Sequence, residues 1–596
     1  MYFRLKQTKT TPVLQLVESF RNDEGQPRQR ILISLGNVSI PSELWHDLAT
    51  EIENRLLDAP GLLSPNAEVL DWADSIMAEL EKSGKVDRVG RLELEKAIQV
   101  QPGDISHHDT TEVGPSLVVK QAWDQLGMPQ ILKELGFNKT EIRDAAISVF
   151  NRLIEPCSEH ALPQWVKTVA LQELFEERFG HLGDDRFHRI SDRLLRHRKR
   201  IEQALAKKEA DLFNLDRTIY LYDLSNSYFE GVCAKNSLAK RGGKSKEKRN
   251  DAKQIAFGMV LDTNGFVIKH DTFPGNMNDH PTLIKMVESL DPHQESPLVV
   301  MDSGMASEAN LGALRKMGWD YITVKKRPSR LAYDKWFEDL SQFQIVKGRD
   351  GKEPVYVKFL ETQDESLVCC YSESRAAKET QILSNAEKKF LVDLEKLRKR
   401  VSAGRLKNEL KIHQSLGRLK ERHRRIARYY EVSFQPASKT IHWTRMDEKY
   451  DQALQVVGGY VLRTTRKDLD KQTIWKIYIT LTRVESGFRT LKSHLGIRPI
   501  HHQKAKRCRG HIFITILAYH LLHWIEHTLS LHNQRRSWPS IRRLLQTHAY
   551  TTIVLPSQQG PVYHIRKAGQ PDSQQQKIYD LLNISPHNLP VTTSTF

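Results

Sequence analysis

The spacing of hydrophobic and polar residues predicts two kinds of structure in the first third of the chain. In the first 40 residues, VLQLVESF and RILISLG alternate apolar and polar side chains on either side of the turn sequence NDEGQP. This period of two predicts a β-hairpin within residues 1–40. In residues 41–212 the apolar positions recur every three or four residues, as in ELWHDLATEIENRLL. That period predicts a mostly helical region, which is a candidate for binding DNA and equally a candidate for a scaffold.

The pattern changes in residues 213–335, where short apolar runs alternate with amphipathic segments. Three strands are predicted first, at TIYLYDL, IAFGMVL and FVIKHDTF, and the sequence DTNG is typical of a tight turn between the last two. A helix at PTLIKMVESL, a buried strand at SPLVVMD, a helix ending at Gly318 and a strand at WDYITVKK follow. This is the order of an α/β ribonuclease-H-like core, whose mixed sheet has three antiparallel strands followed by parallel ones.

The second half of the chain departs from that core and then returns to it. Residues 336–465 combine short strand-like runs with a long basic helical stretch, which Gly404 divides into a helix pair, and we expect an inserted α+β subdomain there. In residues 466–535 the core resumes with two helices. The tail, residues 536–596, contains one predicted helix near QQQKIYDLL.

The length of the chain indicates several domains, and its net charge indicates the class of its binding partner. A chain of 596 residues is too long for one ordinary core, so several domains are expected. Its 90 Lys and Arg against 73 Asp and Glu give a net charge of +17, which favours a polyanion as partner. A merely basic protein remains an alternative at this point. For the basic helix pair, a dimerising coiled coil, a solvated face and a DNA clamp all stay open.

The cysteines and the most apolar segment indicate where the protein works. Five cysteines without any C-x-x-C spacing suit a reducing cytoplasm and no structural zinc. The N-terminus lacks the apolar core of a signal peptide. The most apolar run, residues 512–525, is interrupted by two histidines and is short for a membrane span, so a buried helix and no membrane are expected. The histidines of HHDTTE (107–112) and HH (501–502) are expected to be solvated, because no partner stands at ligand spacing.

Three acidic residues stand where such a core would carry its chemistry. Asp223 is predicted to end the first strand and Asp302 the fourth, and ligands bind at the carboxyl ends of strands in open α/β sheets. Taken singly, each is as well explained as a turn or cap residue. Glu485 lies on a predicted helix among many bases and shares a face with Arg489 and Lys492. A surface ion pair with Arg489 is the alternative reading of Glu485.

The apolar stripe of this helix explains how it would reach the sheet. Leu481, Phe488, Leu491 and Leu495 lie beside the charged face and can seat the helix. Three clustered carboxylates are stable together only with cations among them, and hard oxygen ligands suit two Mg²⁺ or Mn²⁺ ions. Such ions activate a water or 3′-hydroxyl and stabilise the leaving oxygen of a phosphodiester, while neighbouring bases hold the DNA backbone.

Several motifs resemble those of the bacterial insertion-sequence DDE transposases, in the branch with a Tyr-x2-Arg-x3-Glu-x6-Lys signature. They are YLYDLSNSYFEG, the segment SKEKRNDAKQIAFGMVLDTNGFVIKHDTFPGNMND, VVMDSGMASEANL, and GGYVLRTT followed by YITLTRVESGFRTLKSHLGIRPIHHQKAKRCRGHIFITILAYHL. The opening segment from MYFRLK to ILISLG is also similar to the family. The resemblance covers most of the chain, with a long insertion between the second Asp and the Glu.

This resemblance implies roles for particular residues. The three acids would form the metal-binding triad. Lys492 matches the signature lysine, which contacts DNA phosphate near the cut end, and Tyr478 matches the signature tyrosine. The signature arginine position holds Leu481, a departure from the family. Arg483 lies off that helical face, and Arg489 is the better-placed substitute.

The resemblance also implies the reaction and its partners. Family members cleave DNA at the inverted-repeat ends of their element and transfer the freed 3′-hydroxyls to target DNA, in a synaptic complex for which a homodimer is expected. The expected location is the bacterial cytoplasm, at the nucleoid when bound to DNA. Some relatives hold a flipped base with an aromatic residue of the insertion. Trp443 is the candidate by position, and a packed core tryptophan is the alternative.

A basic loop and two rival functions complete the expectations. The loop RGGKSKEKR (241–249) lacks a phosphate-loop pattern, and we expect DNA contacts from Lys244, Lys246 and Arg249. One rival function is a DNA-binding protein of transposase descent that no longer cuts. The other is a different ribonuclease-H-like nuclease, such as a junction resolvase. The intact triad counts against the first, and the inserted subdomain and the N-terminal segment count against the second.

Overall fold

A computed structural model describes most of the chain. The described residues are 1–595 without 9–11, 22–26, 37, 58–65, 84–99, 101, 216, 242–248, 250, 278–279, 291–295, 327–330, 338, 348–352, 363 and 558–559. They form two compact units. One comprises residues 1–107, 553–565 and 593–596, and the other comprises residues 108–552 and 566–592.

The first unit is built around a small antiparallel sheet. Its strands are β1 (Tyr2–Lys6), β2 (Val13–Arg21) and β3 (Pro27–Ser34), and its helices are α1 (Trp45–Leu57) and α2 (Ala67–Lys82). The predicted hairpin is confirmed as β2 and β3, and β1 pairs with the other side of β2, with Phe3 opposite Leu16. Leu16, Leu48 and Leu80 meet in one hydrophobic core, so the strands and both helices share their interior.

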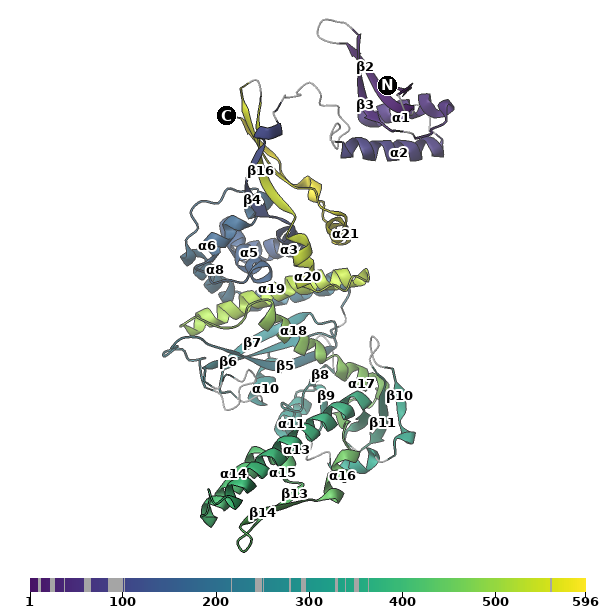
Figure 1. Cartoon of the computed structure of the whole chain (residues 1–596). Coiled ribbons are helices and arrows are strands. Elements are labelled where there is room, and N and C mark those ends of the chain that lie inside the picture. The colour runs from purple at the N-terminus through teal and green to yellow at the C-terminus, as the bar shows by residue number, and fades with distance from the viewer. Residues whose placement is uncertain are drawn as a thin grey trace. The chain divides into compact units, whose positions relative to one another are not determined.

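A nine-stranded mixed sheet forms the centre of the second unit (Figure 1). Its order is β10-β11-β12-β15-β9-β8-β5-β6-β7. The central strands are β5 (Ile219–Tyr228), β6 (Gln254–Leu261), β7 (Val267–Pro274), β8 (Leu298–Met301) and β9 (Asp320–Val324). β5, β6 and β7 are antiparallel, whereas β8 and β9 continue parallel to β5. The predicted sequence of strands and helices is confirmed, and the mixed sheet is compatible with a ribonuclease-H-like fold.

One predicted strand end is wrong. Asp223 was expected at the end of its strand, but β5 runs on to Tyr228 because its second half stays paired with β6, from Leu224 opposite Gly258 to Tyr228 opposite Gln254. Pairing with β8 does stop beside Asp223, since Tyr222 and Met301 are the last partners. Asp302 follows β8 directly, as predicted.

Helices cover both faces of this sheet. α10 (His280–Val287) and α11 (Glu308–Lys316) share one hydrophobic core with Tyr222 of β5. On the other face, Leu221 and Phe257 pack in a second core with α18 (Thr482–Ser493) and α19 (Ala505–Leu531). α19 runs between the sheet and the N-terminal helices of this unit (Figure 1). The predicted buried helix at 512–525 is therefore confirmed. In the part of the chain that the structure describes, no helix combines the length and apolarity that a membrane crossing needs.

The N-terminal helices of this unit precede β5 along the chain. They are α3 (Gly114–Gln125), α4 (Met128–Glu134), α5 (Lys139–Ile154), α6 (Leu162–Trp165), α7 (Leu171–Leu174), α8 (Asp184–Arg196) and α9 (Arg198–Phe213). α5 begins with a capping box, in which Asn138 and Glu141 exchange side-chain and backbone hydrogen bonds. The predicted helical region is confirmed here, with β4 (Ser106–Glu112) as an unpredicted strand.

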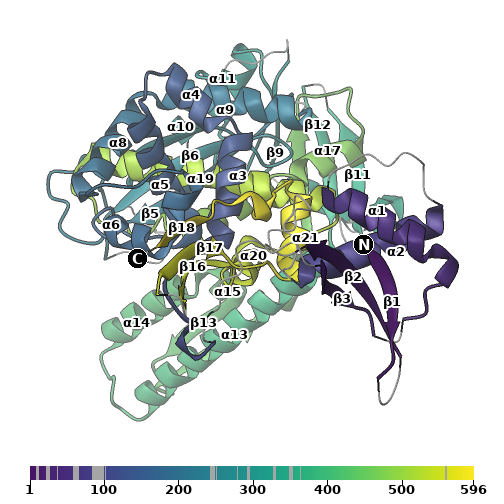
Figure 2. The ribbon, with the colours of Figure 1, turned by 90° about the horizontal axis from the view of Figure 1, so that it is seen from above.

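The inserted segment extends the sheet and adds a lobe of its own. β10 (Gln344–Val346), β11 (Val355–Glu361), β12 (Ser366–Tyr371) and β15 (Gly459–Thr464) join the edge next to β9. The lobe contains α13 (Glu373–Ser402), α14 (Glu409–Arg422), α15 (Arg424–Ala427), β13 (Tyr430–Gln435), β14 (Thr440–Arg445) and α16 (Asp447–Gln455). The predicted helix pair is confirmed as α13 and α14, which run side by side (Figure 2). Gly404, with φ +67°, lies between them, a conformation that favours glycine.

The C-terminal segment holds more β-structure than its sequence predicted. After α17 (Lys471–Ile479), α18 and α19, the helices α20 (Trp538–Leu545) and α21 (Ser573–Leu581) follow. α21 is the helix predicted near QQQKIYDLL. The strands β16 (Ala549–Pro556), β17 (Val562–Ala568) and β18 (Thr592–Thr595) were not predicted and form a four-stranded sheet in the order β18-β17-β16-β4.

Candidate active site

The two predicted aspartates stand next to each other on neighbouring strands. β5 and β8 are parallel, and their pairing ends with Tyr222 opposite Met301, so Asp223 and Asp302 come next on each strand. Both are half-buried. The Asp302 carboxylate accepts a hydrogen bond of 2.7 Å from the backbone N–H of Gly304, which fixes the turn after β8. Two carboxylates are thus held at one point of the sheet.

Helix α18 brings the third acid to this point. Its predicted apolar stripe is confirmed as buried: Leu481, Phe488, Leu491 and Leu495 are at most 7% exposed. The ring of Phe488 packs edge-on against Phe257 of β6, with ring centroids 5.3 Å apart. Seated in this way, the helix turns Glu485 toward solvent on its charged face. The Glu485 carboxylate forms no hydrogen bond or ion pair with any residue that the structure describes, so the predicted alternative, a pair with Arg489, is not formed.

A cavity joins β5 to the charged face of α18. Its volume is about 360 Å³. The lining residues come from β5, from α18 and from the segment after α18: Asp223, Leu224, Ser225, Glu485, Phe488, Arg489, Lys492, Ser493 and Arg498. Two of the three predicted acids, and two predicted DNA-contacting bases, therefore face one space. We call this space the acidic cavity, although bases line its rim.

The charges of Asp302 and Glu485 both act on the hydroxyl of Tyr478. Burial raises the pKa of the Tyr478 hydroxyl, and the negative charges of Asp302 and Glu485 raise it further, while Arg375 opposes them. Asp302 is not among the residues that line the acidic cavity, yet it and Glu485 act on the same tyrosine. Arg375 is a contribution of the inserted segment that the sequence did not predict; its guanidinium lies over the ring of Tyr460, 4.7 Å from the centroid.

The other predicted DNA contacts are dispersed. Arg483 does not line the acidic cavity. Burial lowers the pKa of His523 and His527 on α19, and the charge of Arg483 lowers both further. Arg249 binds Asp251 at 2.9 Å and stacks on Tyr228. Trp443 is half-buried in the core of the inserted lobe, under the guanidinium of Arg398 at 5.2 Å. Lys244 and Lys246 lie outside the described residues.

Arg498 is the lining residue that sequence reasoning left unassigned. It was one of many bases near Glu485, and nothing in its spacing separated it from the others. The fold places it here because the segment after α18 turns back, and its guanidinium Nε donates to the carbonyl oxygen of Lys492 at 3.3 Å.

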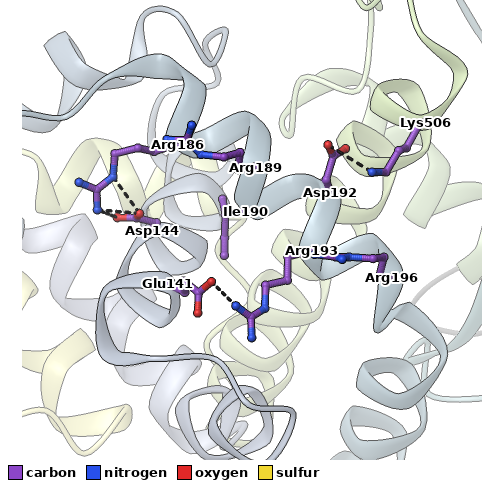
Figure 3. A pocket seen from close by; sticks show the side chains of 9 residues that line it. All are labelled: Glu141, Asp144, Arg186, Arg189, Ile190, Asp192, Arg193, Arg196 and Lys506. Carbon is purple, nitrogen blue, oxygen red and sulfur yellow. Dashed lines mark hydrogen bonds and ion pairs between the residues drawn. The ribbon is translucent and has the colours of Figure 1, made fainter.

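A second cavity, of about 590 Å³, lies among α5, α8 and the start of α19 (Figure 3). Four arginines of α8 line it, at the spacing of one helical face: Arg186, Arg189, Arg193 and Arg196. Arg186 binds Asp144 at 2.9 Å, and Arg193 binds Glu141. Arg189 and Arg196 are exposed and form no ion pair within the described part of the chain. The cavity therefore presents two uncompensated guanidinium groups.

The neighbouring residues His501 and His502 differ in their exposure to solvent, and only one of them is as predicted. His501 is exposed, as predicted. The expectation is wrong for His502, whose Nε2 lies 3.2 Å from a carboxylate oxygen of Glu159 and whose ring lies against His511. Glu159 comes from a distant part of the chain, so no sequence spacing signals its contact with His502. His107 and His108 lie on the exposed strand β4.

Models of two protein families match the chain. A model of the transposase DDE domain matches residues 234–521, which include Asp302 and Glu485, and Asp223 lies shortly before this range. A model of the N-terminal domain of the IS1634 family transposases matches residues 3–59. No curated protein matches the chain. Together the two family matches cover more than half of the sequence, in residues 3–59 and in residues 234–521, and the chain belongs to the insertion-sequence DDE transposases.

Proposed function

We propose that this transposase cleaves DNA at the inverted-repeat ends of its element and joins the freed 3′-hydroxyls to target DNA. Asp223, Asp302 and Glu485 are the proposed metal-binding triad of a ribonuclease-H-like core. One observation carries this proposal: Asp223 and Glu485 line one cavity, and Asp302 occupies the strand position beside Asp223.

The donor set fits hard divalent cations. All three side chains offer only carboxylate oxygens, and Glu485 is exposed and unpaired among the described residues. Such oxygens suit Mg²⁺ or Mn²⁺, and three acids at one point need cations to offset their repulsion. Two bound ions would supply activation of a water or 3′-hydroxyl and stabilisation of the leaving oxygen.

The chain's own residues would hold the DNA around this point. Arg489, Lys492 and Arg498 line the acidic cavity and can bind phosphate oxygens on either side of the scissile bond. The Tyr478 hydroxyl is protonated at neutral pH, as in any tyrosine, and burial raises its pKa further, so it can donate a hydrogen bond to phosphate. Tyr478 and Lys492 support the Tyr-Arg-Glu-Lys branch, which stays a prediction.

A second DNA contact is proposed at the arginine face of α8. Arg189 and Arg196 are exposed, lie seven residues apart and lack carboxylate partners among the described residues. Two turns of helix separate them by about 10 Å, a span that a sugar–phosphate backbone can follow. This face lies within residues 41–212, for which DNA binding is an expectation from the sequence. Synapsis of two ends makes a homodimer the expected assembly.

The test compares three proteins on DNA that carries the element's own ends. Wild type, Glu485→Gln and Glu448→Gln are assayed for DNA binding and for Mg²⁺-dependent nicking. Glu448 is an exposed glutamate of α16 away from the acidic cavity and serves as the matched control. We expect wild type and Glu448→Gln to cut, and Glu485→Gln to bind but not to cut, because glutamine keeps the shape of the side chain and removes its charge.

Each other outcome points to a different function. Cutting by Glu485→Gln at the wild-type rate would remove Glu485 from the triad. Binding without cutting by all three proteins would favour a transposase descendant that only binds DNA. Cutting without any joined product, on a substrate with target DNA, would favour another ribonuclease-H-like nuclease.

A further inference from the structure

A second group of metal-ligand side chains lies apart from the acidic cavity. Glu159 follows α5, His502 lies in the segment between α18 and α19, and His511 is on the second turn of α19. The ligand atoms of the three side chains all lie within 4.8 Å of one another. The Glu159 carboxylate is 3.2 Å from His502 Nε2, and the rings of His502 and His511 have centroids 5.4 Å apart.

The chemistry of these donors differs from that of the triad. Two imidazoles and one carboxylate are the ligand set of a three-residue Zn²⁺ site, in which water takes the fourth position. Mg²⁺ prefers oxygen ligands alone and would favour the acidic cavity instead. We propose that Glu159, His502 and His511 form a zinc site that holds the segment between α18 and α19.

The surroundings of His511 support ligation through one particular nitrogen. Its Nε2 lies 3.4 Å from the carbonyl oxygen of Ile497. A metal-binding histidine commonly donates its other ring N–H to a backbone carbonyl, which fixes the ring and its tautomer. Nε2 thus faces the carbonyl, and Nδ1 is the nitrogen left for the ion.

The three side chains are mostly buried, which shields the site from bulk water, and the small exposed fraction of each leaves a path for an ion. The side chains of Glu159 and His502 are 12% and 15% exposed, and His511 is 8% exposed. The buried Arg152 donates to the carbonyl oxygen of Cys157, and its positive charge acts on Glu159 and His511. The positive charge of Arg152 lowers the affinity of these three ligands for Zn²⁺ below the affinity that they would have without a cation nearby.

Zinc at this site would stabilise one wall of the acidic cavity. The segment between α18 and α19 carries Arg498, which lines that cavity. The segment is also tied to the end of β5, because Ser227 Oγ donates to Ile497 O at 3.3 Å and the N–H of Ile500 donates to Tyr228 O at 2.9 Å. Fixing His502 would fix the other end of the same segment.

The test uses the full chain, stripped of metal by a chelator and titrated with Zn²⁺ in the presence of excess Mg²⁺. The variants are His502→Gln and Glu159→Gln, and the control is His501→Gln, the exposed neighbour. We expect wild type and His501→Gln to bind one Zn²⁺ and gain thermal stability. The two site variants should bind it more than about tenfold more weakly, since even an outer partner of a ligand is worth that much. Co²⁺ in place of Zn²⁺ should give the visible absorption of a tetrahedral site in wild type and His501→Gln, and not in the two site variants.

Several results would overturn the proposal. Wild type without bound Zn²⁺, or His502→Gln with wild-type affinity, excludes the site. Loss of zinc binding in Glu485→Gln, rather than in the two site variants, would assign the ion to the acidic cavity. The melting temperatures of the metal-free variants show whether a variant binds zinc weakly only because it fails to fold. The proposal requires weaker zinc binding in both Glu159→Gln and His502→Gln. DNA cleavage is not part of this readout, so failure of the proposed function leaves the zinc measurement unaffected.

Discussion

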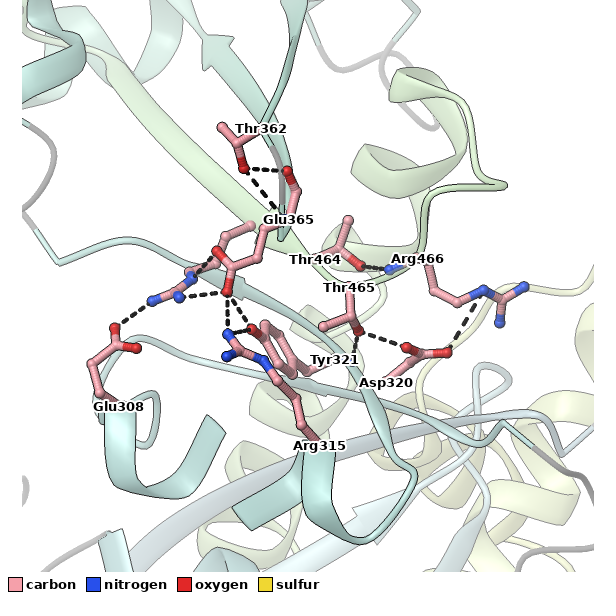
Figure 4. A network of polar contacts seen from close by, with 10 residues as sticks. Glu308, Arg315, Asp320, Tyr321, Thr362, Glu365, Thr464, Thr465 and Arg466 are labelled. Carbon is pink, nitrogen blue, oxygen red and sulfur yellow. Dashed lines mark hydrogen bonds and ion pairs between the residues drawn. The ribbon is translucent and has the colours of Figure 1, made fainter. Parts of the chain in front are cut away.

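A polar network couples the inserted strands to the central sheet, and Glu365 is its centre (Figure 4). The Glu365 carboxylate accepts hydrogen bonds from Arg463 Nε of β15 at 2.7 Å and from Arg315 of α11 at 2.7 Å, and from the Tyr321 hydroxyl of β9. Arg463 also donates to Glu308 at 2.6 Å. We predict that Glu365→Gln loosens the junction between β9 and the inserted strands.

The size of the effect follows from burial. The side chains of Arg463 and Glu365 are 11% and 7% exposed, whereas Glu308 is 77% exposed and can compensate little. Removing one partner of a buried ion pair costs about 3–5 kcal/mol, because the other charge stays buried. Arg315 is 44% exposed and adds little. We therefore expect the lower end, about 3 kcal/mol, which is about a hundredfold in the opening equilibrium.

Amide hydrogen exchange measures this equilibrium locally, without requiring that the whole chain unfold in one step. Peptides that cover β9 and β15 should exchange about a hundredfold faster in Glu365→Gln than in wild type. The control Glu308→Gln removes the exposed end of the network and should change exchange little. The pair Glu365→Leu with Arg463→Met removes both charges and should recover most of the protection. Unchanged exchange in Glu365→Gln, or a double variant as labile as the single one, would refute the reasoning.

The same carboxylate predicts a direction with pH. Burial by itself raises the pKa of Glu365, but the hydrogen bonds from Arg463 and Tyr321 outweigh it and hold the pKa below 4.5. A carboxyl with a depressed folded pKa contributes stability that is present above its unfolded pKa and is lost as the pH falls through the folded one. The difference between wild type and Glu365→Gln should thus be full at neutral pH and shrink below about pH 4.5.

Three further predictions test the proposed DNA contacts and the packing of the sheet. Arg489→Ala should weaken binding to end DNA and reduce the slope of log affinity against log salt by about 0.9, the value for one phosphate contact, as a salt titration would measure. Arg189→Ala combined with Arg196→Ala should reduce that slope by about 1.8 and leave the melting temperature unchanged, since both side chains are exposed. Gly275→Ala should destabilise the fold by more than about 1 kcal/mol in urea unfolding, because the new Cβ would lie 2.0 Å from a backbone carbonyl oxygen. In the control Gly312→Ala, on α11, the new Cβ meets no atom within 4 Å. This control should stabilise the fold by up to about 1 kcal/mol.

Local patterns were sufficient to predict the elements of the core. Alternation, a tight-turn sequence and short apolar runs identified β5 to β9, and the stripe through Phe488 identified the buried face of α18. These signals work because a strand or helix that packs on one core must repeat its apolar side chains at its own period. The separation of α13 from α14 was also predictable from the local sequence, because Gly404 between them has a positive φ, which favours glycine.

What the sequence did not reveal depends on pairing between distant segments. β5 was expected to end at Asp223, but its length is set by β6, which pairs with it up to Tyr228. β4, β16 and β17 have weak patterns of their own and exist because they pair with one another. The contact of Glu159 with His502 joins two segments that no spacing rule connects. In each case the deciding partner lies far along the chain.

The unpaired carboxylate of Glu485 adds to the support that the shared cavity gives its proposed role. Arg489 is one helical turn away, in the position for an ion pair worth only a few tenths of a kcal/mol, and that pair is not formed. An acid whose purpose was to offset nearby bases would be bound to one of them. Glu485 instead faces the same cavity as Asp223, with Lys492 and Arg498 on its rim. This arrangement leaves the carboxylate available to a cation and puts basic side chains in the same cavity, which supports the metal-dependent DNA cleavage that we propose.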